Sequence, residues 1–364
     1  MIPRLKGWLT ANALRLVLWW KSRPGLVRGL LASKDYPKPE PPKSQVVRVG
    51  VVQLRLELIG DGVSYASKMY DLVLQAAQAG AQLLVFPEET GTHLLGLLPG
   101  LEAMTRGKSL EGALAEMDGV QVADVFRAVG PAAQRIYETT FSELAKRFGV
   151  YIVAGSINLP DENGELYNVA YLFGPDGRVL GTQRKTHLLM IEEQWGFRSG
   201  DVVQAFQTPL ARIAFPICMD HTYFEPARIA WLQGAEVIID PSANYEVYNY
   251  WKQARGVWGR IQESPCYGIL SSMVGDFLGF TFQGRSGVYR PLAMDPQGGS
   301  VIAEARTAGR EEIVVADLDM AALRRFRAGQ QALLNTGLYR KYLPALYETH
   351  RQSQREGRRS LLVE

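Results

Sequence analysis

Cysteine and histidine are scarce in this chain. Its 364 residues include two cysteines, Cys218 and Cys266, and four histidines. Two cysteines cannot build a disulfide framework, and no Cys-x-x-Cys spacing is present that would hold zinc. The sequence therefore fits a reducing compartment such as the cytoplasm, and we expect neither a metal ion nor another cofactor.

Long uninterrupted apolar runs and a large excess of one charge are also missing. Hydrophobic residues make up 47% of the chain, charged residues make up 21%, and the formal net charge is +3. These are ordinary values for a soluble globular protein, so they argue against wholesale disorder and against a bundle of membrane spans. The length allows one large domain or two modest ones.

The small net charge conceals a basic N-terminal arm, residues 1–44. Only basic residues carry charge before Asp35, so the remainder of the chain is net acidic. A basic helix that carries tryptophans is typical of a segment lying on a membrane surface. On a helical wheel the apolar side chains gather opposite Lys6 and Lys21, and they are Leu5, Trp8, Leu9, Leu16, Trp19 and Trp20.

This arm is too short to span a bilayer. Asn12 and Arg15 interrupt the stretch from Trp8 to Trp20, which falls short of the roughly 20 residues that a spanning helix needs. Arg15 also argues against a secretory signal peptide. We expect peripheral binding to the inner face of a membrane, and the alternative is that the helix packs on the protein or mediates oligomerisation.

A proline-rich segment, Lys38 to Lys43, ends the arm and predicts a stiff spacer, because its prolines prevent a helix. Beyond it we expect a catalytic domain over residues 45–325. Residues 326–364 would form a basic helical tail, for which oligomerisation is one role. The arginines of this tail lack interleaved aromatic residues, so we expect no nucleic-acid binding, and they are Arg351, Arg355, Arg358 and Arg359.

From Val46 onward, short β-branched runs alternate with helical patterns. Helices predicted at 69–79, 141–148 and 226–233 each close at a glycine, after which a strand begins. This alternation predicts an α/β fold, a mixed sheet with helices packed on it. The predicted strands are 46–52, 83–86, 151–154, 166–173, 178–183 and 237–239.

Three short segments at strand ends carry reactive side chains. Phe86-Pro87-Glu88 offers a carboxylate, Arg184-Lys185-Thr186-His187-Leu188 offers an ammonium group, and Ile217-Cys218-Met219-Asp220 offers a thiol. Strand ends on a rigid scaffold are where proteins commonly place reacting groups. A carboxylate, an ammonium group and a thiol together can cut a carbon-nitrogen bond.

The order and spacing of these segments resemble the nitrilase superfamily of carbon-nitrogen hydrolases. The resemblance continues through Tyr167-Asn168, Asp240-Pro241-Ser242-Ala243, Gly284-Arg285-Ser286 and Ala316-Asp317-Leu318-Asp319, and it covers roughly residues 46–325. It implies a four-layer αββα sandwich that pairs into a homodimer or a larger homo-oligomer. It also implies a Glu-Lys-Cys catalytic triad, here Glu88, Lys185 and Cys218.

The residues suit the chemistry that this resemblance implies. Cys218 would attack an amide carbonyl, and nearby Lys185 would lower the pKa of its thiol. Glu88 would carry protons from the thiol to the leaving amine and later activate water. The backbone N–H of Met219 and the Lys185 ammonium would stabilise the oxyanion, at about 3 kcal/mol for each donor.

Other residues of these segments are candidates for supporting roles. A second glutamate often completes the site of this family, and counting back from Gly200 favours Glu193 over Glu192. Further pocket candidates are His93, His187, His221 and Asn244. Met219-Asp220 after the nucleophile resembles the amidase branches more than the nitrile-hydrolysing branch, in which Trp-Glu is typical.

The long segment 89–140 bears on the substrate. We read it as a connection that contains an apolar loop, Leu94 to Leu101, and that loop suggests an acyl-chain wall or else core packing. Together with the arm, it motivates the hypothesis of an amidase for long-chain acyl amides or lipopeptides at a membrane. The alternatives are a nitrilase, an N-acyltransferase and a catalytically idle membrane-bound scaffold.

Overall fold

The computed structural model describes residues 13–38, 40, 45–116, 119–295, 297–329, 335–345 and 347–348. Trp8 of the arm and the arginines of the tail from Arg351 onward lie outside these residues. The chain divides into two compact units, Met1–Leu323 and Arg324–Glu364. Residues 336–345 of the second unit are helical, and α11 (Met320–Gly329) begins in the first.

The described strands form one sheet that consists of two halves. In the first half the order is β5-β4-β3-β2-β1-β13, with β1, β2 and β3 parallel and the other neighbours antiparallel. Its strands are β1 (Val46–Arg55), β2 (Leu83–Val85), β3 (Tyr151–Pro160), β4 (Leu166–Phe173), β5 (Val179–Arg184) and β13 (Glu312–Asp319).

The second half repeats this plan in the order β6-β7-β8-β9-β11-β12, with β7, β8 and β9 parallel. A short parallel pairing of β1 with β9, at Leu54 with Met273 and Arg55 with Val274, joins the halves. The strands are β6 (Ala205–Gln207), β7 (Arg212–Ala214), β8 (Val237–Ser242), β9 (Tyr267–Phe277), β10 (Phe280–Phe282), β11 (Gly287–Tyr289) and β12 (Val301–Glu304).

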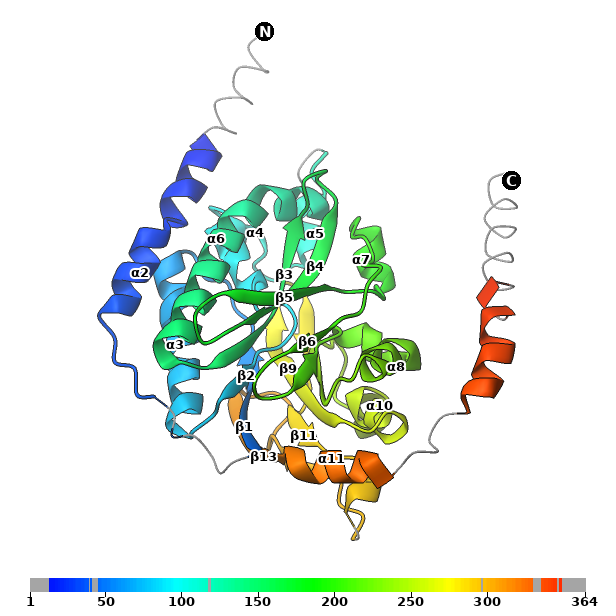
Figure 1. Ribbon diagram of the computed structural model, residues 1–364. Coiled ribbons are helices and arrows are strands. Elements are labelled where there is room, and N and C mark those ends of the chain that lie inside the picture. The colour runs from blue at the N-terminus through cyan, green and yellow to red at the C-terminus, as the bar shows by residue number, and fades with distance from the viewer. Residues whose placement is uncertain are drawn as a thin grey trace, which may run out of the picture. The chain divides into compact units, whose positions relative to one another are not determined.

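Three hydrophobic cores separate four layers. Helices α3 (Gly62–Gln78) and α6 (Val122–Phe148) pack on the first half of the sheet, and α8 (Phe224–Leu232) and α10 (Val257–Glu263) pack on the second (Figure 1). Between the halves lies a core to which both contribute, including Val49, Val51, Val85, Ile213, Ile239 and Ile269. The predicted αββα sandwich is therefore confirmed.

The continuous run of buried residues in β1 follows from this arrangement, because a strand covered on both faces needs apolar side chains on both. The remaining elements are short and lie mostly in the connections. They are α2 (Pro24–Ala32), η1 (Thr92–Leu97), α4 (Leu101–Met104), α5 (Leu110–Leu114), α7 (Met190–Gln194), η2 (Cys218–Thr222), α9 (Tyr250–Ala254) and η3 (Leu292–Met294).

One predicted connection is in fact largely helical. Helix α6 begins at Val122 and continues through Pro131, so the reading of 89–140 as a connection was wrong for its second part. Gly130 and Pro131 look like helix breakers in the sequence. The tertiary structure accounts for the glycine, since a side chain at Gly130 would meet the Pro160 ring at 2.6 Å.

The N-terminal segment packs on the helical layer. Residues 13–21 are helical, and Leu18, Val27 and Leu31 are buried in the core that contains α3 and α6. The Arg135 guanidinium donates to the Ser22 hydroxyl at 2.8 Å, which ties the segment to α6. In the described part of the chain, no helix is both long enough and apolar enough to cross a membrane.

Candidate active site

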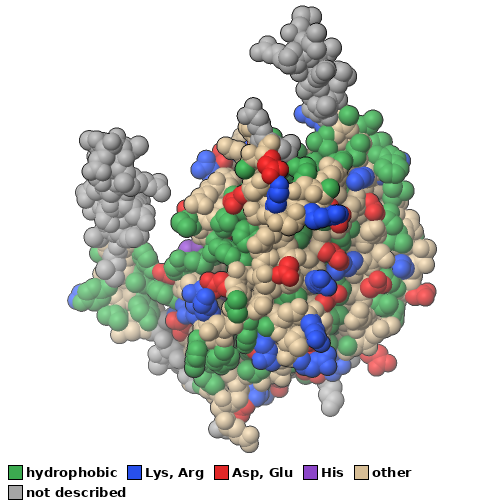
Figure 2. Space-filling model, turned by 180° about the vertical axis from the view of Figure 1, so that it is seen from behind, with side chains coloured by type: hydrophobic (Ala, Val, Ile, Leu, Met, Phe, Trp, Pro, Cys, Tyr) green, Lys and Arg blue, Asp and Glu red, His purple; other side chains and the backbone are tan. Residues whose placement is uncertain are grey.

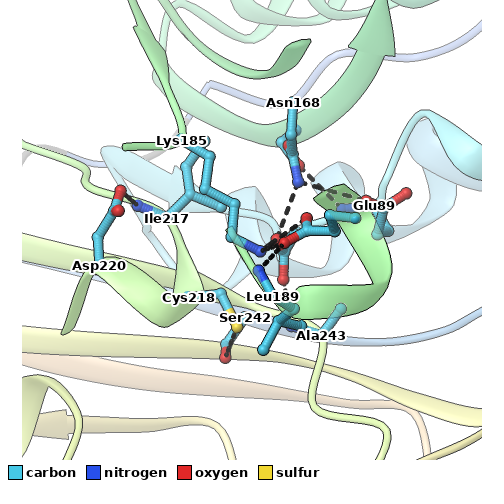
Figure 3. Close-up of polar contacts among 12 residues, drawn as sticks. Glu89, Asn168, Lys185, Leu189, Ile217, Cys218, Asp220, Ser242 and Ala243 are labelled. Carbon is cyan, nitrogen blue, oxygen red and sulfur yellow. Dashed lines mark hydrogen bonds and ion pairs between the residues drawn. The ribbon is translucent and has the colours of Figure 1, made fainter. Parts of the chain in front are cut away.

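The three motifs meet where strands of both halves end. Glu88 follows β2, Lys185 follows β5, and Cys218 begins η2 soon after β7. In Figure 3, Lys185 lies at the centre, with Asn168 on one side and Cys218 and Ser242 on the other. Segments far apart in the sequence thus place a carboxylate, an ammonium group and a thiol at one site.

Lys185 is almost fully enclosed, with a side chain only 1% exposed. Its Nζ lies 2.8 Å from Oε1 of Glu88 and 2.8 Å from each carboxylate oxygen of Glu192. A buried ammonium group is tolerated only where it is paired and hydrogen-bonded. These carboxylates raise the pKa of Lys185 well above its ordinary value although burial opposes them, so the lysine stays charged.

The glutamate that completes this cluster is Glu192. The sequence favours Glu193, but the side chain of Glu193 is exposed on α7, whereas that of Glu192 points inward to Lys185. The Glu192 carboxylate also accepts from the backbone N–H of Leu189 at 2.7 Å, at the start of α7. This contact fixes the rotation of the helix and therefore decides which of the adjacent glutamates faces Lys185.

Glu88 is held on both of its oxygens. The Asn168 side chain donates to Oε1 at 2.9 Å, and the Ala243 backbone N–H donates to Oε2 at 2.9 Å. Burial raises the pKa of Glu88 to about 7, with Lys185 opposing the rise and Glu192 adding to it. Near neutral pH this carboxyl group is therefore able both to accept and to donate a proton.

Glu89 is part of the same polar network, and the sequence analysis missed it. Its backbone has a positive φ of 65°, a conformation that is uncommon for a residue with a side chain. Oε2 accepts from Asn158 at 2.7 Å and from Thr92, and Oε1 accepts from Asn168 at 3.3 Å. Because Asn168 contacts both glutamates, Glu89 helps to position the amide that holds Glu88. A second acidic residue after Glu88 was the only available signal.

Cys218 adopts a backbone conformation that is rare for a side-chain-bearing residue, with φ at +47°. The Ser242 hydroxyl donates to Sγ at 3.3 Å, and Asn244 Oδ1 lies 3.8 Å from Sγ. Burial and the Glu88 charge raise the pKa of Cys218 well above its ordinary value, and Lys185 lowers it by less. Our expectation that Lys185 makes the thiol acidic is therefore wrong for the resting site, because desolvation outweighs the cation.

Asp220 connects the nucleophile loop to the lysine loop. Its buried carboxylate accepts from the backbone N–H groups of Ile217 at 2.9 Å, Thr186 at 3.0 Å and His187 at 2.7 Å. Burial works against the charge, but the hydrogen bonds from His187, Ile217 and Thr186 lower the pKa of Asp220. This stable anion fixes Cys218 and Lys185 relative to each other.

The three histidine candidates have structural surroundings. His93 is buried against the backbone of Glu57, with Nδ1 2.7 Å from its carbonyl oxygen, and burial lowers the pKa of His93 to about 3. His187 contacts Asp220 at 3.1 Å and stacks on Tyr223. His221 lies with Nε2 2.9 Å from the Pro216 carbonyl oxygen.

Of the four pocket candidates, only Asn244 lines a cavity next to the site in the described part of the chain. In the described part of the chain, His93, His187 and His221 line neither of the two cavities that adjoin the motif residues, whereas Asn244 lines one. The prediction of pocket histidines is therefore wrong. Their imidazoles already bind backbone or carboxylate groups that the fold buries around the site.

The first cavity, of about 660 Å³, opens beside Glu88, Lys185 and Glu192. Its wall includes Leu95 of the predicted apolar loop. Most of the remaining wall is aliphatic or aromatic, with Leu56, Leu110, Phe126, Ile191, Trp195, Phe277, Leu278, Phe280 and Phe282. This cavity suits an apolar substituent.

The second cavity, of about 810 Å³, opens beside Cys218 and Met219. It therefore contains the thiol and the residue whose N–H was predicted to face the oxyanion. Its wall is mixed and carries many more polar side chains than the wall of the first cavity, among them Thr222, Asp240, Ser242, Asn244, Asn249, Gln253 and Gln283.

The chain is similar in sequence to known enzymes. Residues 48–328 match the carbon-nitrogen hydrolase family. The Pyrococcus abyssi nitrilase is 32% identical over 288 residues, which cover 78% of this chain and 93% of the relative. The Danio rerio omega-amidase NIT2 is 32% identical over 290 residues, 76% of this chain and 89% of the relative. The probable hydrolase YhcX of Bacillus subtilis is 29% identical, and the chain spans about half (51%) of its length.

Solved structures show the same fold at lower identity. A carbon-nitrogen hydrolase from Helicobacter pylori superimposes with a TM-score of 0.62 at 22% identity, covering 82% of this chain and 98% of that protein. A variant of the amidase from Nesterenkonia sp. AN1 superimposes with a TM-score of 0.59 at 19% identity, covering 84% of this chain and 100% of that protein.

Proposed function

Because this chain belongs to the carbon-nitrogen hydrolase family, we propose that it hydrolyses amides through a thioester on Cys218. The membership confirms the resemblance that the motifs predicted. The observation that carries the mechanism is the pairing of Lys185 with both Glu88 and Glu192 at 2.8 Å, next to a buried thiol.

Acylation begins from a neutral thiol. Glu88 takes the thiol proton as Sγ attacks the carbonyl carbon, and the electron pair of the carbonyl moves to its oxygen. The Lys185 ammonium, which keeps its proton, and the backbone N–H of Met219 stabilise this oxyanion. Glu88 then gives its proton to the nitrogen, the carbon-nitrogen bond breaks, and the amine leaves a thioester behind.

In deacylation Glu88 takes a proton from water and returns a proton to the thiol. Glu88 accepts a proton from water, the resulting hydroxide attacks the thioester carbonyl, and the same two donors hold the second oxyanion. The carbon-sulfur bond breaks, and Glu88 returns the proton to Cys218. A pKa of about 7 suits Glu88 to each of these transfers.

The first cavity supports an apolar acyl group. Its aromatic and aliphatic wall begins at Glu88 and Lys185, where the carbonyl would react, and Leu95 of the predicted acyl-chain loop belongs to it. We therefore favour long-chain acyl amides over short polar ones, because each buried methylene adds about 0.8 kcal/mol of binding energy.

A screen of acyl amides and nitriles tests this proposal. Purified wild type and Cys218→Ala are incubated with each compound, and the released carboxylic acid is measured. We expect acid from amides with an optimum at longer acyl chains, and none with Cys218→Ala. Acid release by Cys218→Ala contradicts the thioester mechanism, and a preference for nitriles supports the alternative function of a nitrilase.

The N-terminal segment supports binding to a membrane surface. The side chains of Leu16, Trp19 and Trp20 are 67%, 57% and 57% exposed, on the side of the helix away from the buried Leu18. In Figure 2 hydrophobic side chains cover this segment at the upper right, with Lys or Arg side chains beside them. Exposed tryptophans next to cations suit an anionic phospholipid surface.

Flotation with anionic liposomes tests the membrane proposal. We expect the wild type to float with the vesicles and the W19S/W20S double variant to remain at the bottom. Substitution is preferable to truncation because Leu18, Val27 and Leu31 belong to the core. Equal flotation of both proteins would contradict the proposal.

A further inference from the structure

The reacting groups lie between two cavities and are divided between them. Glu88 and Lys185 line the first cavity, and Cys218 lines the second. Leu189, Ala243 and Tyr245 line both and so mark the boundary. A carbonyl that is attacked by Cys218 while its nitrogen is protonated by Glu88 must lie at this boundary. Space for a substituent is then available on each side of the amide bond.

A primary amide would leave one of these spaces empty. Its nitrogen carries only hydrogen, so an acyl group in one cavity would leave the other filled with water alone. An N-substituted amide has a group on each side of the reacting bond. The presence of a cavity on each side of the reacting groups therefore favours the N-substituted class.

The direction of the substrate follows from the proton transfer. The nitrogen must point its lone pair at Glu88 to receive the proton, so the substituent on nitrogen points away from Glu88. The second cavity, which Cys218 lines and Glu88 does not, offers space for such a substituent. The acyl group then takes the first cavity, whose apolar wall suits it, and the amine takes the more polar one.

Asp240 indicates what the amine carries. It belongs to the buried strand β8, it is only 4% exposed, and it lines the second cavity. Its Oδ1 atom has no hydrogen-bond partner among the described residues. A buried carboxylate oxygen without a donor is costly, and a bound N–H or ammonium group would remove this cost.

Asp240 already has protein neighbours, but one of its oxygens is left over. Burial raises the pKa of Asp240 to about 6, and His221 and the backbone N–H groups of Val257 and Cys218 oppose that rise, whereas the Asp220 charge adds to it. None of these groups donates to Oδ1. Lys252 is paired with Glu246 at 2.7 Å, and both side chains are about half exposed, at 52% and 48%. Arg255 is exposed as well. Among the charged residues that line this cavity, Asp240 is therefore buried, whereas Lys252, Glu246 and Arg255 are in contact with solvent.

We propose that the substrate is an N-substituted amide whose apolar acyl group occupies the first cavity and whose amine part occupies the second, where a basic, hydrogen-bond-donating group binds Asp240. This inference rests on the proposed thioester mechanism and adds the substrate class to it. Asp240 is thus a specificity residue, and it contacts the part of the substrate that leaves.

Three substrates with one acyl chain test the two halves of this proposal. They are dodecanamide, N-propyldodecanamide and N-(3-aminopropyl)dodecanamide, and kcat/KM is measured for each with the full-length protein. We expect the aminopropyl amide to exceed the propyl amide by about tenfold or more, as for a hydrogen bond to a charged group. The propyl amide should in turn exceed the primary amide.

Asp240→Asn separates recognition from an indirect effect on the nucleophile. The Asp240 charge also raises the pKa of Cys218, so the variant changes the rates of all substrates through the thiol. Only a loss of recognition changes the ratio of kcat/KM for the aminopropyl amide to kcat/KM for the propyl amide. In Asp240→Asn we expect this ratio to fall to about one. The exposed Asp201 lines neither cavity, and Asp201→Asn is the matched control that should keep the ratio.

Filling each cavity provides a second test that is independent of Asp240. Thr222→Trp narrows the second cavity and should slow the two N-substituted amides more than dodecanamide. Ile191→Trp narrows the first cavity and should slow all three, because they share the acyl group. Both positions are partly exposed, so the larger side chains do not overfill the core.

The outcomes distinguish this inference from the proposed function. If no amide gives a thioester with wild type, the mechanism itself fails. If the thioester forms but dodecanamide is the best substrate, or Thr222→Trp slows all three equally, the assignment of the two cavities is overturned. An unchanged aminopropyl to propyl ratio in Asp240→Asn overturns the role of Asp240.

Discussion

The two halves of the sheet hold their active-site side chains to different degrees. The first half presents Glu88 and Lys185, which are locked with Glu192 by contacts of 2.8 Å. The second half presents Cys218, whose sulfur has only the longer contacts to Ser242 at 3.3 Å and Asn244 at 3.8 Å among the described residues. The charges that stabilise the transition state are therefore fixed before substrate arrives, whereas the nucleophile remains free to form a bond.

This contrast explains why the fold tolerates buried reactive groups in both halves of the sheet. In the first half each buried charge of the cluster has a partner, which offsets the cost of desolvation. In the second half the same burial keeps Cys218 as a neutral thiol. Activation of the thiol then depends on Glu88, which belongs to the other half, so neither half is sufficient alone.

The largest effect is expected from removing the nucleophile. Cys218→Ala should lower kcat for amide hydrolysis by at least about a thousandfold, because no other group can form the thioester. Cys266→Ala removes the other buried thiol and is the matched control. It should keep kcat within about twofold, with some loss of thermal stability from the smaller side chain. Comparable activity of the two variants would show that the thiol of the second half is not the nucleophile.

The next effect comes from loosening the charged cluster of the first half. Glu192→Gln removes one of the two carboxylates that bind Lys185, and we expect kcat to fall by about tenfold to a hundredfold. Glu193→Gln changes the adjacent, exposed glutamate and should leave kcat unaltered. Steady-state kinetics and melting temperatures of both variants check this pair. A larger loss of kcat in Glu193→Gln than in Glu192→Gln would instead assign this role to Glu193.

A moderate effect is expected from pH, because Glu88 must be ionised to take the proton of Cys218. Its pKa of about 7 predicts that kcat/KM rises about tenfold per unit at pH values below 7 and levels off above. The pH dependence of kcat/KM measures the free enzyme directly. A rising limb centred near the ordinary glutamate pKa of 4.5 would mean that the cluster does not hold Glu88 as the structure shows.

The smallest effect concerns stability. The folded-state pKa of Glu88 is raised, so the folded protein binds more protons than the unfolded chain between pH 4.5 and about 7. The contribution of Glu88 is present in full below pH 4.5 and is lost as the pH rises to about 7. Between these pH values the free energy of unfolding of Glu88→Gln should therefore decline less than that of the wild type. Identical pH slopes in urea titrations of both proteins would contradict the prediction.

The sequence predicted the parts of the fold that depend on local patterns. The alternation of strands and helices, and the placement of Glu88, Lys185 and Cys218 at strand ends, follow from periodicity and short motifs. The four-layer arrangement came from the resemblance to a family, because periodicity does not show how two halves of a sheet face each other.

Other features depend on contacts that a single sequence does not contain. Whether Glu192 or Glu193 faces Lys185 is decided by a backbone hydrogen bond of Leu189, and both residues look equivalent in the sequence. Pro131 lies inside α6, and the neighbouring Gly130 packs closely on Pro160, a contact between distant parts of the sequence. The neutral state of Cys218 depends on burial, which outweighs the nearby lysine and can be judged only in three dimensions.

Trapping the acyl-enzyme tests the central claim most directly. Wild type is mixed with an excess of a long-chain acyl amide, quenched in acid within the first turnover, and measured by intact mass and peptide mapping. We predict a mass increase equal to the acyl group on the peptide that contains Cys218, with the peptide of Cys266 unmodified. Hydrolysis without any acylated peptide, or with the acyl group on another residue, would contradict the account.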